Sequence, residues 1–362
     1  MKAMHGFAGP SRKRGRLIGC CTMVALMLSA VAFAVPAGAV EAPPVTTYLA
    51  LGDSLAFGYT AVKKAENAPF GDSPTFYEEG YDNFYAKKVR LNKEIPNKGL
   101  VIVNLGCPGE TSGGLLGSEP PTCGYQKAGL PLHDGYVGHS QIEAALGLLT
   151  QKNGVTSTTP AHPVSVISFN IGGNDELAAV AACEKEVGEE YGNTGKSQYG
   201  DTPEHAVAGC IAAHAPALFE KIVKHIVETM GAIDTTGKYS GPIVFQGFYN
   251  PDSFLLPGSD ILTNILNQEA EKGIKENIPN AVYANPFPKI NPQPKEGQEA
   301  SPKTEAIEQA AICKYTEMCN PVAQAVHEAE AKKALPPNDG DIHPSKAGYE
   351  LLAKLMYEKA PV

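Results

Sequence analysis

Two hydrophobic patterns alternate along most of this chain of 362 residues. Short runs of consecutive apolar residues, rich in Val, Ile, Phe and Tyr, are typical of buried strands. Five such runs cover residues 46–51, 100–105, 164–171, 241–248 and 281–285. Between them apolar residues recur at helical spacing, as at Ile142, Leu146 and Leu149. The alternation predicts an α/β fold with a mainly parallel sheet covered by helices on both faces.

The helices predicted between these strands differ in length. One begins near Ser54, one carries Tyr81, Tyr85 and Val89, and one follows Ser140, which is placed to cap it. Others are expected after residue 172, over 203–230, around 262–269 and from residue 345 or 346 to 359. Residues 66–80, 187–202 and 286–302 are rich in polar, Gly or Pro residues and are predicted to be loops. Without repeats or low-complexity linkers, residues 40–362 are expected to form one domain.

Residues 1–39 have the pattern of a secretory signal peptide. A basic segment precedes an apolar stretch at residues 17–35, and Ala37, Gly38 and Ala39 supply the small residues of a cleavage site. We therefore expect a cleaved leader and a secreted, extracellular protein. An uncleaved membrane anchor is the alternative, because the 19 mostly apolar residues approach the length of a membrane span.

The net charge disfavours some classes of partner. It is −9 for the whole chain, and loss of the leader, which carries five of the 30 basic residues and none of the 39 acidic ones, makes it −14. A chain this acidic is a poor nucleic-acid binder. The sequence pattern indicates no second long apolar run after the leader, so we expect no stable membrane insertion once the leader is removed. We therefore expect no nucleic-acid partner, and we expect a monomer.

Six cysteines follow the leader, an even number that suggests disulfides in an exported protein. They fall into three couples that are local in sequence, and we expect the pairs Cys107–Cys123, Cys183–Cys210 and Cys313–Cys319. A metal site is disfavoured, because neither a Cys-x-x-Cys nor a His-Glu-x-x-His spacing occurs. We therefore expect neither a metal nor a cofactor.

Three of the predicted strands run into unusual glycine-bearing segments. These are Gly-Asp-Ser-Leu at residues 52–55, Gly-Cys-Pro-Gly-Glu-Thr-Ser-Gly-Gly at 106–114 and Gly-Gly-Asn-Asp at 172–175. Because the carboxyl ends of parallel strands meet at one edge of a sheet, the three segments are expected to meet there. A partial copy of the first, at residues 71–73, has no apolar strand before it and is expected to be a loop.

Ser54 and His343 are the candidates for a nucleophile and its base. A hydroxyl at the end of a strand is well placed for attack, and an imidazole takes and returns a proton near neutral pH. Taken singly, Ser54 is more simply interpreted as a helix cap and His343 as a surface residue before a helix. Only their combination with the other segments favours catalysis.

The four segments, in order, resemble the conserved blocks of the SGNH/GDSL hydrolase family. Residues 52–55 resemble block I, 104–112 block II, 172–175 block III, and His343-Pro344 followed by Gly348 resembles block V. The resemblance implies a three-layer α/β/α, flavodoxin-like fold. It also implies an oxyanion hole formed by the backbone N–H groups of Ser54 and Gly109 and the side-chain amide of Asn174, with Gly106 as the alternative to Gly109. A nucleophile elbow of the α/β-hydrolase type is disfavoured, since Gly-x-Ser-x-Gly is missing from the sequence.

The sequence departs from the family at the partner of the histidine. The family usually places a carboxylate three residues before it, where this chain has Gly340. Asp341 is our choice, with Asp339 or a backbone carbonyl as alternatives. Asp53 is expected to shape the turn beside the nucleophile.

The resulting hypothesis is a secreted serine esterase or lipase that cleaves acyl esters through an acyl-enzyme on Ser54. A carbohydrate acetyl esterase would use the same residues, and a non-catalytic extracellular binding module on the same fold is the alternative of another class. The segment that contains Tyr249, Phe254, Leu255 and Leu256 is either the lining of an acyl pocket or a loop packed on the core.

Overall fold

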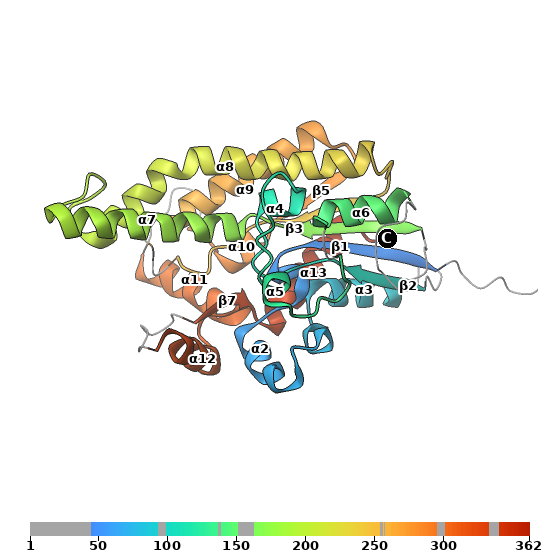
Figure 1. Ribbon diagram of the computed structural model, residues 1–362, viewed down its shortest axis with the longest axis horizontal. Coiled ribbons are helices and arrows are strands. Elements are labelled where there is room, and N and C mark those ends of the chain that lie inside the picture. Colours follow the sequence, from blue (N-terminus) through green and yellow to red (C-terminus); the bar gives the residue numbers. More distant parts are fainter. Residues whose placement is uncertain are drawn as a thin grey trace, which may run out of the picture. The chain divides into compact units, whose positions relative to one another are not determined.

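A sheet of five parallel strands lies at the centre of the fold in the computed structural model (Figure 1). The strands are β1 (Thr46–Gly52), β2 (Leu100–Asn104), β3 (Val164–Asn170), β4 (Ile243–Gln246) and β5 (Ala281–Ala284). They lie in the order β2-β1-β3-β4-β5, with every neighbouring pair parallel. All five predicted strands and the parallel sheet are confirmed.

The structure describes residues 45–92, 99–136, 139–150, 163–253, 256, 258–294, 301–332 and 340–362. Residues from Pro43 to Val362 group into one compact unit, to which all statements below apply. The predicted leader, together with Asp339, Phe254 and Leu255, lies outside the described residues.

Helices cover both faces of the sheet, because successive residues of each strand point to opposite sides. Leu49 and Leu51 of β1 are buried in one cluster with Ile222 of α8 and Leu266 of α9. Tyr48 on the same strand belongs to a second cluster, which includes residues of α3 and α13. The two clusters are the two interfaces of a three-layer α/β/α sandwich, which confirms the expected fold class.

The helices predicted from the sequence are present, together with others that the pattern does not predict, some of them within the expected loops 66–80 and 286–302. Those between β1 and β3 are α1 (Ser54–Phe57), α2 (Ala61–Asn67), α3 (Tyr81–Leu91), α4 (Ser112–Leu116), α5 (Gly124–Ala128) and α6 (Gln141–Thr150), with two 3₁₀ turns, η1 (Ala68–Phe70) and η2 (Pro74–Tyr77). The later ones are α7 (Gly173–Thr194), α8 (Pro203–Thr235), α9 (Ser259–Asn277), α10 (Phe287–Ile290), α11 (Pro302–Tyr315), α12 (Pro321–Ala331) and α13 (Lys346–Lys359). Ser140 and Ser345 accept hydrogen bonds from the first turns of α6 and α13.

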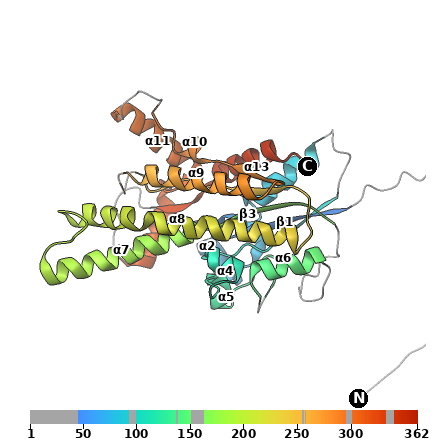
Figure 2. The same cartoon turned by 90° about the horizontal axis from the view of Figure 1, so that it is seen from above.

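The helix α7 is longer than the sequence pattern predicts. It continues to Thr194, into the stretch 187–202 that we expected to be a loop. Val187 packs with Cys183, Ala206 and Cys210 against α8, and this tertiary contact supports helix where the local sequence is polar. Figures 1 and 2 show α7 and α8 lying side by side as a long hairpin that extends beyond the strands.

Among the described residues, one helix is long and apolar enough to cross a membrane by length and composition alone. It is α8, with a mean hydropathy of 1.4 over 18 residues, so a second apolar run does exist after the leader. Phe219, Ile222 and Ile226 of this helix are buried in the cluster that covers one face of the sheet. Only 28 % of the residues in the apolar stretch are buried, so this helix is only partly covered by the rest of the described chain.

The six cysteines form the three expected pairs, Cys107–Cys123, Cys183–Cys210 and Cys313–Cys319. The first joins the segment after β2 to the start of α5, and the second joins α7 to α8. The third closes the short segment between α11 and α12. Each bridge therefore fixes a local excursion, as predicted.

The strand order places the catalytic candidates at a topological switch point. From β1 the chain passes first to β2 on one side and later to β3 on the other, so the two connections leave the sheet in opposite directions. A crevice forms at the carboxyl ends of such a strand pair, and ligands of open α/β sheets bind there. Ser54 follows the carboxyl end of β1, and Asn174 follows that of β3.

Candidate active site

Ser54 is the first residue of α1, directly after a sharp turn at the end of β1. Gly52 has φ of +137°, and a Cβ there would lie 2.3 Å from the backbone oxygen of Asn170. Only glycine fits that turn. Asp53 then caps α1 by accepting a hydrogen bond of 2.9 Å from the N–H of Leu55. It also accepts one from the amide of Asn170, in agreement with its predicted role in shaping the turn.

The hydroxyl of Ser54 lies 2.8 Å from Nε2 of His343, although 289 residues separate the two in sequence. Both side chains are mostly buried, with Ser54 7 % exposed. This distance is within the reach that proton transfer from a nucleophile to its base requires. The structure thus brings together the two residues on which the sequence hypothesis depended.

The carboxylate of Asp341 accepts a hydrogen bond from the other ring nitrogen of His343, Nδ1. This carboxylate is 1 % exposed and accepts two further hydrogen bonds, from the N–H of Ala61 at 2.6 Å and from the N–H of His343 at 3.1 Å. Burial by itself would raise the pKa of Asp341, but the charge of His343 and these hydrogen bonds outweigh it and lower the pKa to about 2. The carboxylate therefore stays ionised at any pH of practical interest.

The position of Gly340 explains why the carboxylate is not three residues before the histidine. His343 lies on β7 (Asp341–Pro344), which pairs with β6 (Thr316–Glu317) in a small antiparallel ribbon that the sequence did not reveal. A Cβ on Gly340 would lie 2.2 Å from the carbonyl oxygen of Met318. No side chain fits against a backbone at that distance, so the carboxylate comes from Asp341 instead.

Tyrosines hold the histidine from the sides. The rings of Tyr59 and His343 pack with centroids 4.7 Å apart. The hydroxyl of Tyr349 on α13 donates to the carbonyl of Tyr59 at 2.7 Å, and that of Tyr249 donates to the carbonyl of Ile342 at 2.8 Å. The segment after β4 therefore fixes the strand that carries His343, and α13 fixes Tyr59, whose ring packs on the histidine.

Asn174 lies in the first turn of α7 and faces the same cavity as Ser54. Its side-chain nitrogen donates one hydrogen bond of 2.9 Å to the carbonyl of Glu110. A primary amide carries two N–H groups, so a second donor remains available for a ligand.

Gly109 and Gly106, the two candidates for the remaining oxyanion donor, differ in their surroundings. Gly109 has φ of +85°, a conformation that favours glycine, and its N–H has no hydrogen-bond partner among the described residues. The N–H of Gly106 already donates to the side chain of Asn104 at 2.8 Å. Gly109 is therefore the better candidate. The described lining of the cavity at Ser54 includes Asn174 but not Gly109.

A buried polar cluster behind Asn174 is a feature that the sequence did not reveal. The hydroxyl of Ser112 donates to Asp175 at 2.9 Å and lies 2.9 Å from Nδ1 of His225, and the N–H of Ser112 donates to Asp175 at 2.8 Å. These contacts join α4, α7 and α8. Ser112 and Asp175 belong to the glycine-bearing segments, so the motifs pointed to these two residues. No feature of the sequence around His225, on the long helix α8, indicated its role.

The partial motif copy at residues 71–73 has a different environment. Its serine, Ser73, lies in an exposed hydrogen bond of 2.9 Å with Thr75, and Asp72 adopts a positive φ of 53° in a loop. No described histidine is bonded to Ser73. The prediction that this copy is a loop is confirmed.

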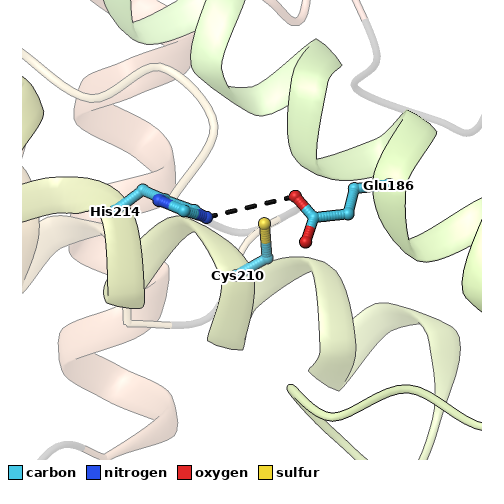
Figure 3. Close-up of side chains that lie close together, drawn as sticks. All are labelled: Glu186, Cys210 and His214. Atoms are coloured by element: carbon cyan, nitrogen blue, oxygen red, sulfur yellow. Dashed lines mark ion pairs between the residues drawn. The ribbon is translucent and has the colours of Figure 1, made fainter.

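Glu186, Cys210 and His214 are grouped closely enough to suggest a metal site, with their ligand atoms within 4.8 Å of one another (Figure 3). The sulfur of Cys210 is bonded to Cys183, however, and so is not a free thiolate. The remaining carboxylate and imidazole are 4.0 Å apart and about half exposed. This group is better described as a disulfide beside a surface ion pair.

Comparisons with known proteins give a likeness in structure only. A scan against protein-family models and a search of curated protein sequences gave no match. Among solved structures, the chain is similar to a member of the lipolytic protein G-D-S-L family from Veillonella parvula, with 14 % identity, a TM-score of 0.41, and coverage of 88 % of this chain and 99 % of that one. It is similar to a catalytic mutant of an acetylxylan esterase from Geobacillus stearothermophilus, with 12 % identity, a TM-score of 0.41 and coverage of 88 % and 95 %. It is also similar to an α/β hydrolase enzyme from the metagenome of Lake Arreo, with 12 % identity, a TM-score of 0.38 and coverage of 87 % and 95 %.

Proposed function

We propose that this protein is a serine hydrolase of the SGNH/GDSL type that cleaves carboxylic esters through an acyl-enzyme on Ser54. The observation that carries the proposal is the distance of 2.8 Å between the Ser54 hydroxyl and Nε2 of His343, with Asp341 bonded to the opposite nitrogen. Nucleophile, base and orienting carboxylate in this order form the arrangement on which acyl transfer by serine depends.

In the first half of the reaction, Ser54 attacks the ester carbonyl while its proton passes to Nε2 of His343. The tetrahedral intermediate collapses when the C–O bond to the alcohol breaks, and His343 returns the proton to the leaving oxygen. Asp341 keeps the hydrogen of the neutral ring on Nδ1 and stabilises the imidazolium that forms. In the second half, water takes the place of the alcohol, and the same transfers release the carboxylic acid and restore Ser54.

The negative charge on the intermediate requires donors beside Ser54. We assign this role to the N–H of Ser54, the N–H of Gly109 and the free N–H of the Asn174 amide. The contact of Asn174 with the Glu110 carbonyl orients the amide and links it to the loop that carries Gly109. Preorganised donors of this kind are worth about 3–4 kcal/mol each in the transition state.

We propose an extracellular location for the enzyme. Three disulfides support it, because such bonds persist mainly in oxidising compartments. Small-molecule or lipid esters are the proposed substrates.

The experiment that tests the function is hydrolysis of p-nitrophenyl butyrate by the wild type and by Ser54→Ala. We expect the variant to lose at least about 10⁴-fold in kcat. Ser73→Ala is the matched control, since it removes the serine of the partial motif copy and should leave turnover unchanged. Equal turnover by Ser54→Ala and wild type would refute the serine mechanism, and inactivity of a folded wild type toward all esters would favour a non-catalytic binding module.

A further inference from the structure

A cavity of about 430 Å³ lies at the carboxyl ends of the strands, lined by Ser54 and by residues of the helical hairpin. Ser54, Asn170 and Asn174 line the end near the nucleophile. The walls come from α7, from α8, from the start of α9 and from the segment after β4. The hairpin that encloses the cavity is the long pair α7 and α8 in Figures 1 and 2.

The walls away from Ser54 are largely apolar. On α8, one face contributes residues at helical spacing, and these are Ala208, Ile211, Ala212, Ala215, Leu218 and Phe219. Ala179 and Val180 of α7 lie opposite, with Phe248 and Leu262 from the other walls. Several of these side chains are alanines, whose small size leaves room for a ligand beside the hairpin.

We propose that this cavity binds the acyl chain of the substrate, and that the enzyme acts on esters of medium- and long-chain fatty acids in preference to acetyl esters. The inference rests on the proposed function, since it takes Ser54 as the nucleophile. The sequence left open whether the segment after β4 lines an acyl pocket or packs on the core. The proposal favours an acyl pocket, to which Tyr249 and Leu256 contribute.

The size of the cavity supports a long chain. An engineered apolar cavity of roughly 150 Å³ binds benzene, so a cavity nearly three times as large has room for on the order of a dozen carbons. An acetyl group would leave most of the apolar wall in contact with water. Burial of that wall by a longer chain releases the water and stabilises the bound state.

Glu176 is the one charged residue of α7 in the described lining, and its environment keeps it compatible with an apolar chain. No hydrogen bond to its carboxyl occurs among the described residues. Burial, and then the neighbouring charge of Asp175, raise the pKa of Glu176 to about 8. At neutral pH the carboxyl is therefore mostly protonated and uncharged. The other titratable groups along the cavity come from the turn after β1, from α8 and from the segment after β4, and these are Asp53, His214, Tyr249 and Asp252.

The test is a series of p-nitrophenyl esters from acetate to palmitate, in which only the acyl chain varies. We expect kcat/KM to rise by up to about fourfold per added methylene until the cavity is filled, the equivalent of about 0.8 kcal/mol for each buried methylene. Ala179→Phe places a ring in the cavity. It should lower kcat/KM for the decanoate at least tenfold and leave the acetate within about twofold.

Ala178→Phe is the matched control, because Ala178 is exposed on the same helix and is not part of the described lining. It should change kcat/KM for neither the decanoate nor the acetate. Binding of dodecanoate to Ser54→Ala, measured by calorimetry, checks the cavity without catalysis. We expect saturable binding that Ala179→Phe weakens at least tenfold, with unchanged circular dichroism.

Two results would overturn the inference while leaving the proposed function intact. One is a kcat/KM that stays constant or falls as the acyl chain is lengthened from acetate, measured with an active wild type. The other is a kcat/KM that rises with the length of the alcohol in a series of alkyl acetates but does not rise with the length of the acyl chain. That result would place the leaving group in the cavity. Loss of all ester hydrolysis would instead refute the proposed function itself.

Discussion

Replacement of Asp341 by asparagine tests the site where this chain departs from the SGNH/GDSL pattern that it resembles. The carboxylate accepts hydrogen bonds on both oxygens, from Ala61 on one and from His343 on the other. Asparagine has only one oxygen. If that oxygen faces His343, the amide N–H₂ meets the N–H of Ala61. If it faces Ala61, the N–H₂ donates to Nδ1 and forces the hydrogen of the ring onto Nε2, where it blocks proton transfer from Ser54.

The structure sets the scale of the expected loss. A pKa lowered from the ordinary value of 3.8 to about 2 corresponds to roughly 2–3 kcal/mol of stabilisation of the carboxylate by its partners. The wrong tautomer costs about 10⁴-fold in rate in other triads, and loss of only part of the carboxylate's interaction with the ring costs less. We expect Asp341→Asn to lower kcat for p-nitrophenyl butyrate by about 10²–10⁴-fold with little change in KM.

The matched control is Asp339→Asn, which removes the other candidate carboxylate and should change kcat by less than about twofold. Both variants should be compared across the pH range, with circular dichroism to confirm folding. A loss of less than about threefold in Asp341→Asn, or a large loss in Asp339→Asn, would contradict the assignment of Asp341 as the orienting carboxylate.

Three further variants test other parts of the structure. Gly340→Asp restores the family's spacing of carboxylate and histidine, but it places a Cβ 2.2 Å from a backbone oxygen. It should therefore lower the melting temperature, and it should not restore activity when combined with Asp341→Asn. A double variant that is stable and active would refute the steric explanation. Burial raises the pKa of Asp82 to about 7. Between about pH 4 and 7 the folded state therefore holds a proton on Asp82 that the unfolded state has lost. The free energy of unfolding then rises as the pH falls through this window, by up to about 1.4 kcal/mol per pH unit. Asp82→Asn should remove that contribution in urea unfolding at pH 4.5–8, and an unchanged pH dependence would contradict it. In the wild type we expect the preference for long acyl chains to decline above about pH 8, where Glu176 loses its proton. Glu176→Gln should abolish this decline. If the decline persisted in the variant, another group would be its cause.

Much of the fold followed from the sequence because its signals are local. The strands were visible as apolar runs, and the cap at Ser345 as a serine before a periodic segment. The proximity of Ser54 and Asn174 was predictable, because both follow strands of a parallel sheet and such strands share one carboxyl edge. The position of His343 needed the family resemblance, since nothing in its own surroundings distinguishes it from a surface histidine.

The features that the sequence did not predict depend on contacts between distant segments. The choice of Asp341 over Asp339 depends on the ribbon of β6 and β7, whose strands of two and four residues are too short to show a period. The extension of α7 depends on its packing against α8, and the cavity depends on how this hairpin meets the start of α9 and the segment after β4 beside Ser54. The contact of His225 with Ser112 spans 113 residues and has no local signature.

Covalent labelling with a fluorophosphonate, followed by peptide mass mapping, tests the role of Ser54 most directly. Such a reagent phosphonylates a serine only where an adjacent base activates it. We expect one adduct per chain on the peptide that contains Ser54, lost in Ser54→Ala and His343→Ala and retained in Ser73→Ala. An adduct on a different serine, or equal labelling of wild type and Ser54→Ala, would contradict the proposed mechanism.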